Sequence, residues 1–273
     1  MYKLISTDID GTIVPYLSSI SEDMLKTIIG LLKKGVLIVP NTGRPLNALN
    51  GQLKDCHFKY YICGNGSYVY DADNKKAIYE AYMDNEMASE LLDYMASFNE
   101  VAIVFMNNIF VADSNMREVI RKSEYSFMEN NMKFIYDLSS RIKSGNDNIQ
   151  KLVLRCDVNK KQNYLKLIKE KFPNLYYTAS GDENIEITDP KAAKDIGLIK
   201  LCEYLHISLD EVIVMGDNDN DLPVLSLGCF NIVPENGNDN AKRKASVVCD
   251  ACENGGPIKT IEKMYEDGLL SEY

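Results

Sequence analysis

The stretch from Lys3 to Thr12 constrains this chain most, because a short apolar run ends there at two aspartates and a glycine. Such a run is typical of a buried strand in a parallel sheet. Ligands of α/β sheets bind beyond the carboxyl ends of the strands, which is where Asp8 and Asp10 lie. Both side chains can point to one side if the backbone stays extended, because they are two residues apart.

Two carboxylates this close repel each other unless a cation or a proton relieves the repulsion. Mg²⁺ meets this need, because it prefers oxygen ligands and often bridges to a substrate phosphate. An ordinary Asp-Gly turn after a strand explains the same residues for backbone reasons alone. The stretch by itself leaves a metal site and a plain turn equally open.

Composition narrows the class of protein. The chain has 273 residues, of which 45% are hydrophobic and 26% charged, as in an ordinary globular protein with one large domain or two modest ones. Its net charge of -10 argues against a nucleic-acid partner, because nucleic-acid phosphates need a basic surface. No apolar run approaches the roughly 20 residues of a membrane span. The N-terminus shows no signal peptide, so we expect a cytoplasmic protein without a membrane partner.

The cysteines and histidines offer little for chemistry. Seven scattered cysteines are typical of reduced thiols in the cytosol. Cys249 and Cys252 form the one close pair, and a metal or redox role for them is the less favoured interpretation because no second pair accompanies them. Neither His57 nor His206 lies in a distinctive motif. Carboxylates are therefore the better candidates for catalysis.

A helix and a second strand follow the first motif. The helix is expected to start after Ser21, and the strand to occupy residues 36–39. Thr42 and Gly43 come next, before Pro45, which suits the first position of a helix. Helix N-termini favour anions, so Thr42 and Gly43 are candidates for an anion site. Taken alone, the segment from Thr42 to Pro45 is also a common turn, which explains the same residues without a function.

The pattern changes between residues 83 and 186. Paired strand-like runs alternate there with helical runs, which predicts an α+β module with an antiparallel sheet. Because α/β patterning resumes afterwards, we expect an inserted domain at residues 83–186 and a core domain formed by residues 1–82 and 187–273. The expected elements of the insert are helices at 86–98, 116–128 and 160–172, strands at 101–106, 109–112, 150–156, 175–178 and 184–188, and a polar linker at 139–148.

Two further motifs follow the insert. Asp189 and Pro190 predict the start of a helix with Lys194 in its second turn, where a lysine opposes the helix dipole and favours a partner anion. Taken alone, Lys194 is equally explained as a solvated surface lysine, the commoner case. A strand at residues 211–215 then ends at the acidic run 216–221. That run lacks the glycine and glutamate that a calcium loop needs at its sixth and twelfth positions. We therefore expect its acids to lie beside those of the first strand and to be functional.

Four motifs thus follow one another along the chain: Asp8-x-Asp10-Gly11-Thr12, Thr42-Gly43-Arg44, Lys194, and Gly216-Asp217-x-x-Asn220-Asp221. Together they resemble the signature of haloacid dehalogenase (HAD) superfamily phosphatases, and the insert resembles the large α/β cap of the Cof-like subfamily. The resemblance implies an α/β fold, with a Rossmann-like core on a mostly parallel sheet and an inserted α+β cap that selects the substrate. One departure is the segment from Lys191 to Asp195, where the subfamily usually has a Lys-Gly step. Lys194 rather than Lys191 matches the family's lysine, counted from Thr188.

The resemblance also implies roles for single residues. Asp8 would attack phosphorus, and Asp10 would protonate the leaving alcohol and then activate water. Thr42 and Lys194 would stabilise the transferring group by hydrogen bonding and by charge. The implied substrate-binding residues are Gly43, Arg44 and Asn220. The implied Mg²⁺ ligands are Asp8, Asp10 through its backbone carbonyl, Asp217, and Asp221, which would hold the water shell of the metal or Lys194.

The function predicted in this way is a Mg²⁺-dependent phosphatase that hydrolyses a small phosphorylated metabolite, such as a sugar phosphate or a phosphorylated cofactor, through an aspartyl-phosphate. Two alternatives remain. A phosphomutase or phosphotransferase would use the same intermediate, and a non-catalytic regulatory protein could bind a metabolite on the same fold. Intact Asp8, Asp10 and Lys194 argue against the second alternative. The sequence does not identify the phosphoester, the cap residues that select it or the oligomeric state.

Overall fold

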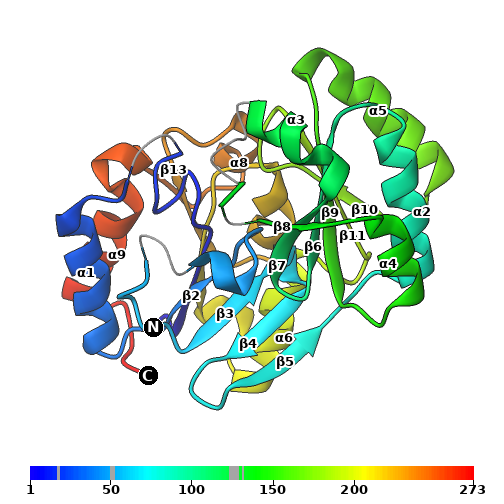
Figure 1. The fold of residues 1–273 in the computed structure, drawn as a ribbon. Helices are drawn as coiled ribbons and strands as arrows, with labels where there is room; N and C mark the ends of the chain where they lie inside the picture. The colour runs from blue at the N-terminus through cyan, green and yellow to red at the C-terminus, as the bar shows by residue number, and fades with distance from the viewer. Residues whose placement is uncertain (17–18, 50–52, 123–128, 131) are drawn as a thin grey trace. The chain divides into compact units, whose positions relative to one another are not determined.

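The computed structural model describes residues 1–16, 19–49, 53–122, 129–130 and 132–273 (Figure 1). The chain forms two compact units. The core unit comprises Met1–Arg44, Leu49–Glu80 and Ala193–Tyr273, and the insert unit comprises Pro45–Ala48 and Ala81–Ala192.

The core unit is built on a parallel sheet with the strand order β14-β13-β12-β1-β2. Its central strand, β1 (Leu4–Thr7), is buried throughout and lies between β12 (Val212–Met215) and β2 (Ile38–Pro40). β13 (Phe230–Pro234) and β14 (Val247–Cys249) complete the sheet. Because these strands are parallel, the carboxyl ends of β1, β2 and β12 lie at one edge, and the residues that follow them meet there.

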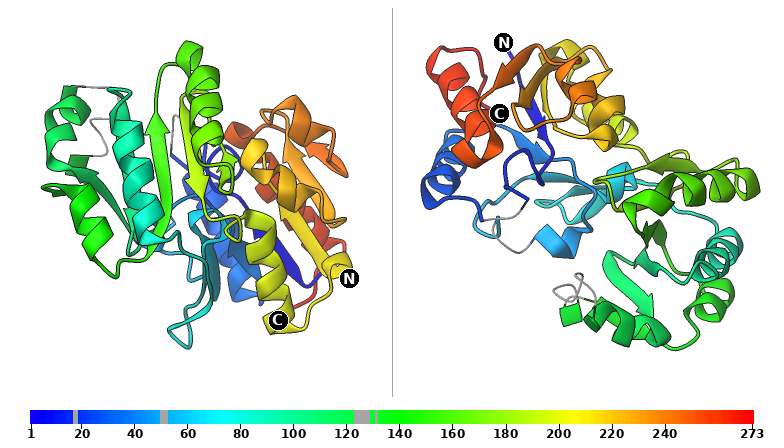
Figure 2. Two further views of the ribbon diagram at one scale, coloured as in Figure 1. Left: turned by 90° about the vertical axis from the view of Figure 1, so that its right-hand side faces the viewer. Right: turned by 90° about the horizontal axis from the view of Figure 1, so that it is seen from above.

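Helices cover both faces of this sheet. α1 (Glu22–Lys33) and α9 (Gly256–Glu266) lie side by side on one face, and α6 (Lys194–Leu205) lies on the other (Figures 1 and 2). Two short helices, α7 (Leu222–Leu225) and α8 (Asp239–Lys242), follow β12 and β13. Apolar side chains of α6, α7 and α8 pack with those of β1 and β12 in one buried cluster. This packing fixes the start of α6 relative to the ends of the strands.

A second, antiparallel sheet of the core unit contains β3 (Tyr60–Cys63), β4 (Tyr68–Asp71) and β5 (Lys76–Glu80). The short 3-10 helix η2 (Gly64–Gly66) joins β3 to β4 and packs against α6. Gly66 has a φ of +88°, and a Cβ at this position would lie 2.0 Å from the carbonyl oxygen of Ala193. Only glycine allows this close approach between the two segments.

The insert unit contains a sheet with the strand order β10-β11-β9-β6-β7-β8, which is antiparallel except for the β7–β8 pair. Figure 2 shows α2 and α5 packed on this sheet. One apolar cluster joins the sheet to α2, α4 and α5. The elements are α2 (Asn85–Ala96), β6 (Val101–Met106), β7 (Ile109–Asp113), α3 (Arg117–Lys122), β8 (Met132–Ile135), α4 (Leu138–Ser144), β9 (Ile149–Arg155), α5 (Val158–Lys171), β10 (Tyr176–Thr178) and β11 (Asn184–Thr188).

The predicted fold class is confirmed, because the structure has a parallel α/β core and an α+β insert. The polar linker predicted at 139–148 is wrong, because α4 begins there. Its Leu138 and Ile142 lie four residues apart and both pack into the insert's apolar cluster, which outweighs the polar composition of the segment. The strand β8 was not expected, because its four residues carry little pattern.

Three predicted helix boundaries also differ. The helix expected at 116–128 is α3, which ends at Lys122, and residues 123–128 lie outside the described residues. The sequence pattern also predicts a helix at residues 239–245, and the observed helix, α8, ends at Lys242. Pro45 precedes only a 3-10 helix, η1 (Leu46–Leu49). Among the helices described, none combines the length and the apolar character that a membrane crossing requires.

The contact between η2 and α6 predicts a large effect of Gly66→Ala. Its Cβ would meet a backbone carbonyl and the residue would keep a positive φ, so the free energy of unfolding should fall by about 3 kcal/mol. Gly228→Ala is the matched control, because Gly228 also has a positive φ (+83°) but no atom within 4 Å of its Cβ position. Gly228→Ala should lower the free energy of unfolding by about 1 kcal/mol. Urea unfolding measures both, and equal losses would contradict this account.

Candidate active site

The loop after β1 is a tight turn that places Asp8 and Asp10. Asp8 is buried, and its backbone N–H donates to the carbonyl of Met215 at the end of β12 (2.9 Å). The carbonyl of Ile9 then accepts hydrogen bonds from three backbone N–H groups of the same turn. Only glycine fits at position 11, because Gly11 has a φ of +81° and a Cβ would lie 2.5 Å from Asp217 Oδ2. The sequence motif is therefore a rigid local structure.

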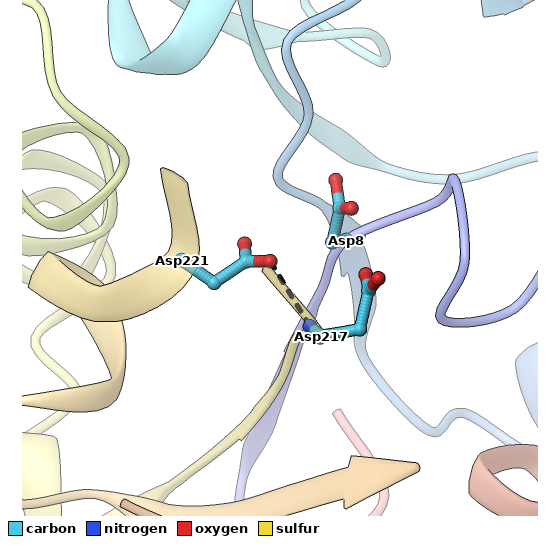
Figure 3. A group of neighbouring side chains, drawn as sticks. All are labelled: Asp8, Asp217 and Asp221. Carbon is cyan, nitrogen blue, oxygen red and sulfur yellow. Dashed lines mark hydrogen bonds between the residues drawn. The ribbon is translucent and has the colours of Figure 1, made fainter. Parts of the chain in front are cut away.

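Three carboxylates come together beyond β1 and β12 (Figure 3). Asp8 follows β1, Asp217 follows β12, and Asp221 belongs to the 3-10 helix η6 (Asp219–Asp221). All three are buried, and one ligand oxygen from each lies within 4.8 Å of the others. The structure thus gathers three of the four residues that were predicted to hold a metal.

Lys194 lies between two of these acids. Its Nζ donates to Asp8 Oδ1 and to Asp221 Oδ1, both at 2.7 Å. Burial alone would lower the pKa of Lys194, but Asp221 and Asp8 outweigh burial and raise it above its usual value. Lys194 therefore stays charged. Lys191, by contrast, is exposed in the preceding turn, so the geometry favours Lys194 as the lysine of the site.

The predicted start of this helix at Asp189 is wrong. α6 begins at Lys194 itself, with Ala193 as N-cap. Asp189 instead closes a turn, in which its side chain accepts from the backbone of Lys191 (2.8 Å) and its carbonyl accepts from Ala192 (2.8 Å). A local side-chain hydrogen bond of this kind competes with helix formation. Lys194 consequently lies in the first turn rather than the second.

Asp221 is held by three donors. Besides Lys194 on Oδ1, the backbone N–H groups of Asp217 (3.1 Å) and Asn218 (3.2 Å) donate to its Oδ2; the first of these bonds is the dashed line in Figure 3. Gly216 makes room for this carboxylate, since a Cβ there would lie 2.6 Å from Asp221 Cγ. Asp221 thus fixes both Lys194 and the loop that carries Asp217.

Asp217 receives two hydroxyl donors. Thr12 Oγ1 donates to its Oδ1 and Tyr16 Oη to its Oδ2, both at 2.9 Å. Burial and the nearby Asp221 charge raise the pKa of Asp217 to about 7, although these two hydrogen bonds oppose the rise. Burial also raises the pKa of Asp8, against the influence of Lys194. Three carboxylates facing one ammonium leave an excess of two negative charges when all are ionised, which is the charge balance that a divalent cation relieves.

Asp10 is not part of this cluster, because its carboxylate pairs with Arg44. The Arg44 guanidinium donates through Nε to Asp10 Oδ2 (2.8 Å) and through Nη2 to Asp10 Oδ1. This fork-like pairing is the geometry that arginine and carboxylate favour. Arg44 was predicted to bind substrate, so the structure adds an interaction that the sequence analysis did not contain.

The other predicted site residues lie at the same edge of the core unit. Thr42 is buried two residues beyond β2, and Gly43 follows it. The Thr42 hydroxyl accepts from the backbone N–H of Arg44 (3.2 Å). Asn220 belongs to η6 and is buried, and its Oδ1 has no hydrogen-bond partner among the described residues. A buried polar atom of this kind points to a ligand or a water.

Sequence reasoning missed three side chains that hold the site together. Tyr16 contacts Asp217, as described above. Asn41 donates to Ser6 Oγ (3.2 Å) and to the carbonyl of Lys194 (3.0 Å), and Asn236 donates to the carbonyl of Gly11 (2.8 Å). These bonds span 35 to 225 residues of sequence, so no local pattern could have revealed them.

Comparisons with known proteins identify the family of this chain. A family model described as haloacid dehalogenase-like hydrolase matches residues 5–261. The chain therefore belongs to the haloacid dehalogenase-like hydrolase family, which confirms the resemblance drawn from the sequence.

Similar proteins extend the comparison. The 5-amino-6-(5-phospho-D-ribitylamino)uracil phosphatase YwtE of Bacillus subtilis is 26% identical over 286 residues, covering 96% of this chain and 98% of that protein. A solved HAD/COF-like hydrolase of Plasmodium vivax has a TM-score of 0.84 at 24% identity, covering 97% of this chain and 96% of that one. A HAD subclass IIB sugar phosphatase has a TM-score of 0.79 at 19% identity, covering 98% and 99%. The predicted enzyme class, a HAD-type phosphatase, is confirmed.

The raised pKa of Asp217 predicts an unusual pH dependence of stability in the presence of a chelator. Between the unfolded value near 4 and about 7, the folded protein binds more protons at this group, so its contribution to stability falls as pH rises and is constant above 7. From pH 5.5 to 8, Asp217→Asn should therefore gain about 2 kcal/mol relative to wild type. Urea unfolding in EDTA measures this, and parallel pH profiles of the two proteins would contradict it.

Proposed function

We propose that this chain is a Mg²⁺-dependent phosphatase that hydrolyses a small phosphorylated metabolite through an aspartyl-phosphate on Asp8. The buried cluster of Asp8, Asp217 and Asp221 around one lysine carries this proposal. Phosphomonoesters are anions, so a carboxylate can attack one only where positive charge offsets the repulsion. Lys194 supplies one such charge, and the excess of acids calls for another.

The donor set fits Mg²⁺. Its ligand atoms are carboxylate oxygens, which this hard ion prefers, and the raised pKa values of Asp8 and Asp217 mark carboxylates whose negative charge is not fully compensated. Asp8, Asp217 and the backbone carbonyl of Asp10 would hold the ion, with Asp221 holding its water shell. When bound, the ion offsets the charge of the transferring phosphoryl group.

Asp8 and Asp10 divide the chemistry between them. A carboxylate oxygen of Asp8 forms a bond to phosphorus while the bond from phosphorus to the leaving oxygen breaks, and Asp10 gives that oxygen its proton. In the second step Asp10 takes a proton from water, the water oxygen bonds to phosphorus, and Asp8 is released. Lys194 holds Asp8 in place during both steps, because it is itself anchored by Asp221.

Arg44 acquires a double role in this proposal. Its guanidinium donates two hydrogen bonds to the Asp10 carboxylate, whereas in the first step that carboxyl group has to reach the leaving oxygen. Arg44 would therefore exchange the Asp10 carboxylate for the incoming phosphate, which frees Asp10 to carry a proton. Thr42, the Gly43 amide and Asn220 would donate hydrogen bonds to the same phosphate.

The relatives support the class of substrate. One is named for a phosphorylated ribityl compound and another for sugar phosphates, so we favour a small metabolite with a phosphorylated polyol or sugar. The insert domain, predicted at residues 83–186, would select the group attached to that phosphate. Free thiols at all seven cysteines fit the expected cytoplasmic location.

Replacing the nucleophile tests the proposal. Asp8→Asn should lower phosphate release from phosphorylated sugars and polyols by a factor on the order of 10³ or more, because an amide cannot form the intermediate. The assay compares reactions with and without Mg²⁺. Asp73→Asn, in an exposed turn of the core unit, is the matched control and should keep full activity.

Two outcomes of that assay would contradict the proposal. Unchanged phosphate release by Asp8→Asn would show that Asp8 is not the nucleophile. Conversion of the substrate with no free phosphate would indicate a phosphomutase or phosphotransferase instead.

The assigned acid predicts a dependence on the leaving group. Asp10→Asn should lower kcat/KM, which reports the transfer to Asp8, by about 10²-fold or more for sugar phosphates, whose alkoxide leaves poorly without a proton, and clearly less for p-nitrophenyl phosphate, whose phenolate leaves readily. Steady-state kinetics on both substrates measures this. An equal loss on both would show that Asp10 does not act as the acid.

A further inference from the structure

Tyr16 contacts the acidic cluster directly, although the motifs assign it no role. The residue is 50% exposed, yet its hydroxyl reaches the buried Asp217 carboxylate at 2.9 Å. Its ring lies against Gly11, where a Cβ would come within 2.2 Å of the ring. The tight turn after β1 and the loop after β12 thus meet through this side chain as well as through Thr12.

The hydrogen bonds around Asp217 suit a metal ligand. Thr12 donates to Oδ1 and Tyr16 to Oδ2, so each oxygen keeps a lone pair for a further partner. Both donors are neutral hydroxyls and would not repel a neighbouring cation. Asp221 differs, because the charged Lys194 and two backbone N–H groups occupy its oxygens.

The tyrosine hydroxyl is itself oriented. Asn218 Nδ2 approaches Tyr16 Oη at 3.4 Å as a weak donor, which leaves the hydroxyl proton for Asp217. On the other side of the same carboxylate, the Thr12 hydroxyl is buried. The carboxylate plane of Asp217 is therefore set by two donors from the loop after β1, rather than by its own loop alone.

We propose that Tyr16 is a positioning residue of the metal centre, whose hydroxyl holds Asp217 in the orientation that binds Mg²⁺. This inference rests on the proposed function, because it assumes that Asp217 is a metal ligand. Partners that orient metal ligands change affinity about 10- to 100-fold when they are removed. Ring packing against Gly11 has no such consequence for the metal.

Tyr16→Phe separates the effect of the hydroxyl on the metal from the packing of the ring, because it keeps the ring and removes the hydroxyl. Isothermal titration of the substrate-free protein with Mg²⁺ should show a Kd raised about 10-fold or more. The Mg²⁺ concentration that gives half-maximal activity should rise by the same factor, while kcat at saturating Mg²⁺ falls by less. Unfolding temperatures in EDTA establish that the variant is folded.

Tyr265→Phe is the matched control. Tyr265 also donates to a carboxylate, Glu272 Oε1 at 3.2 Å, but on an exposed part of the core unit. This variant should keep the Mg²⁺ Kd of wild type. A Tyr16→Phe variant that binds Mg²⁺ within twofold of wild type would overturn the inference alone. Wild-type protein that binds no Mg²⁺ would overturn both the inference and the metal dependence of the proposed function.

Discussion

The site depends on one buried ammonium shared by two acids. Lys194 comes from the first turn of α6, where the helix dipole disfavours a positive charge, and its own desolvation adds to the cost. Asp8 and Asp221 offset both costs through short charge-assisted hydrogen bonds. Removing Lys194 would leave both acids as uncompensated buried charges. The three therefore hold the ends of β1, β12 and α6 in one arrangement.

The surrounding structure serves this arrangement. The apolar cluster between the core sheet and α6 sets the position of the helix, and the close approach of Gly66 to Ala193 sets where the helix begins. Asn41 then holds the start of the helix, because its side-chain amide donates to the Lys194 carbonyl. Small residues and amides thus position the start of α6, and the ion pairs of Lys194 complete the arrangement.

The sequence predicted those site residues that lie just beyond the carboxyl ends of buried strands. Asp8 and Asp217 each come directly after, or one residue after, a buried apolar strand, and parallel strands bring such residues to one edge. The start of α6 and the pairing of Arg44 with Asp10 could not be predicted. The first depends on a turn that competes with a helix, and the second joins residues 34 apart. In the insert unit, α4 was missed because its apolar face consists of two residues in a polar segment.

In the proposed mechanism, the phosphoryl group is transferred first to Asp8 and then to water. The most direct measurement is the stereochemical course at phosphorus, determined with a phosphorothioate substrate that carries two oxygen isotopes and is hydrolysed in water of the third isotope, so that the thiophosphate product is chiral. Two successive in-line displacements predict retention of configuration. Inversion would mean that water attacks the substrate directly, and the account of Asp8 as nucleophile would then be wrong.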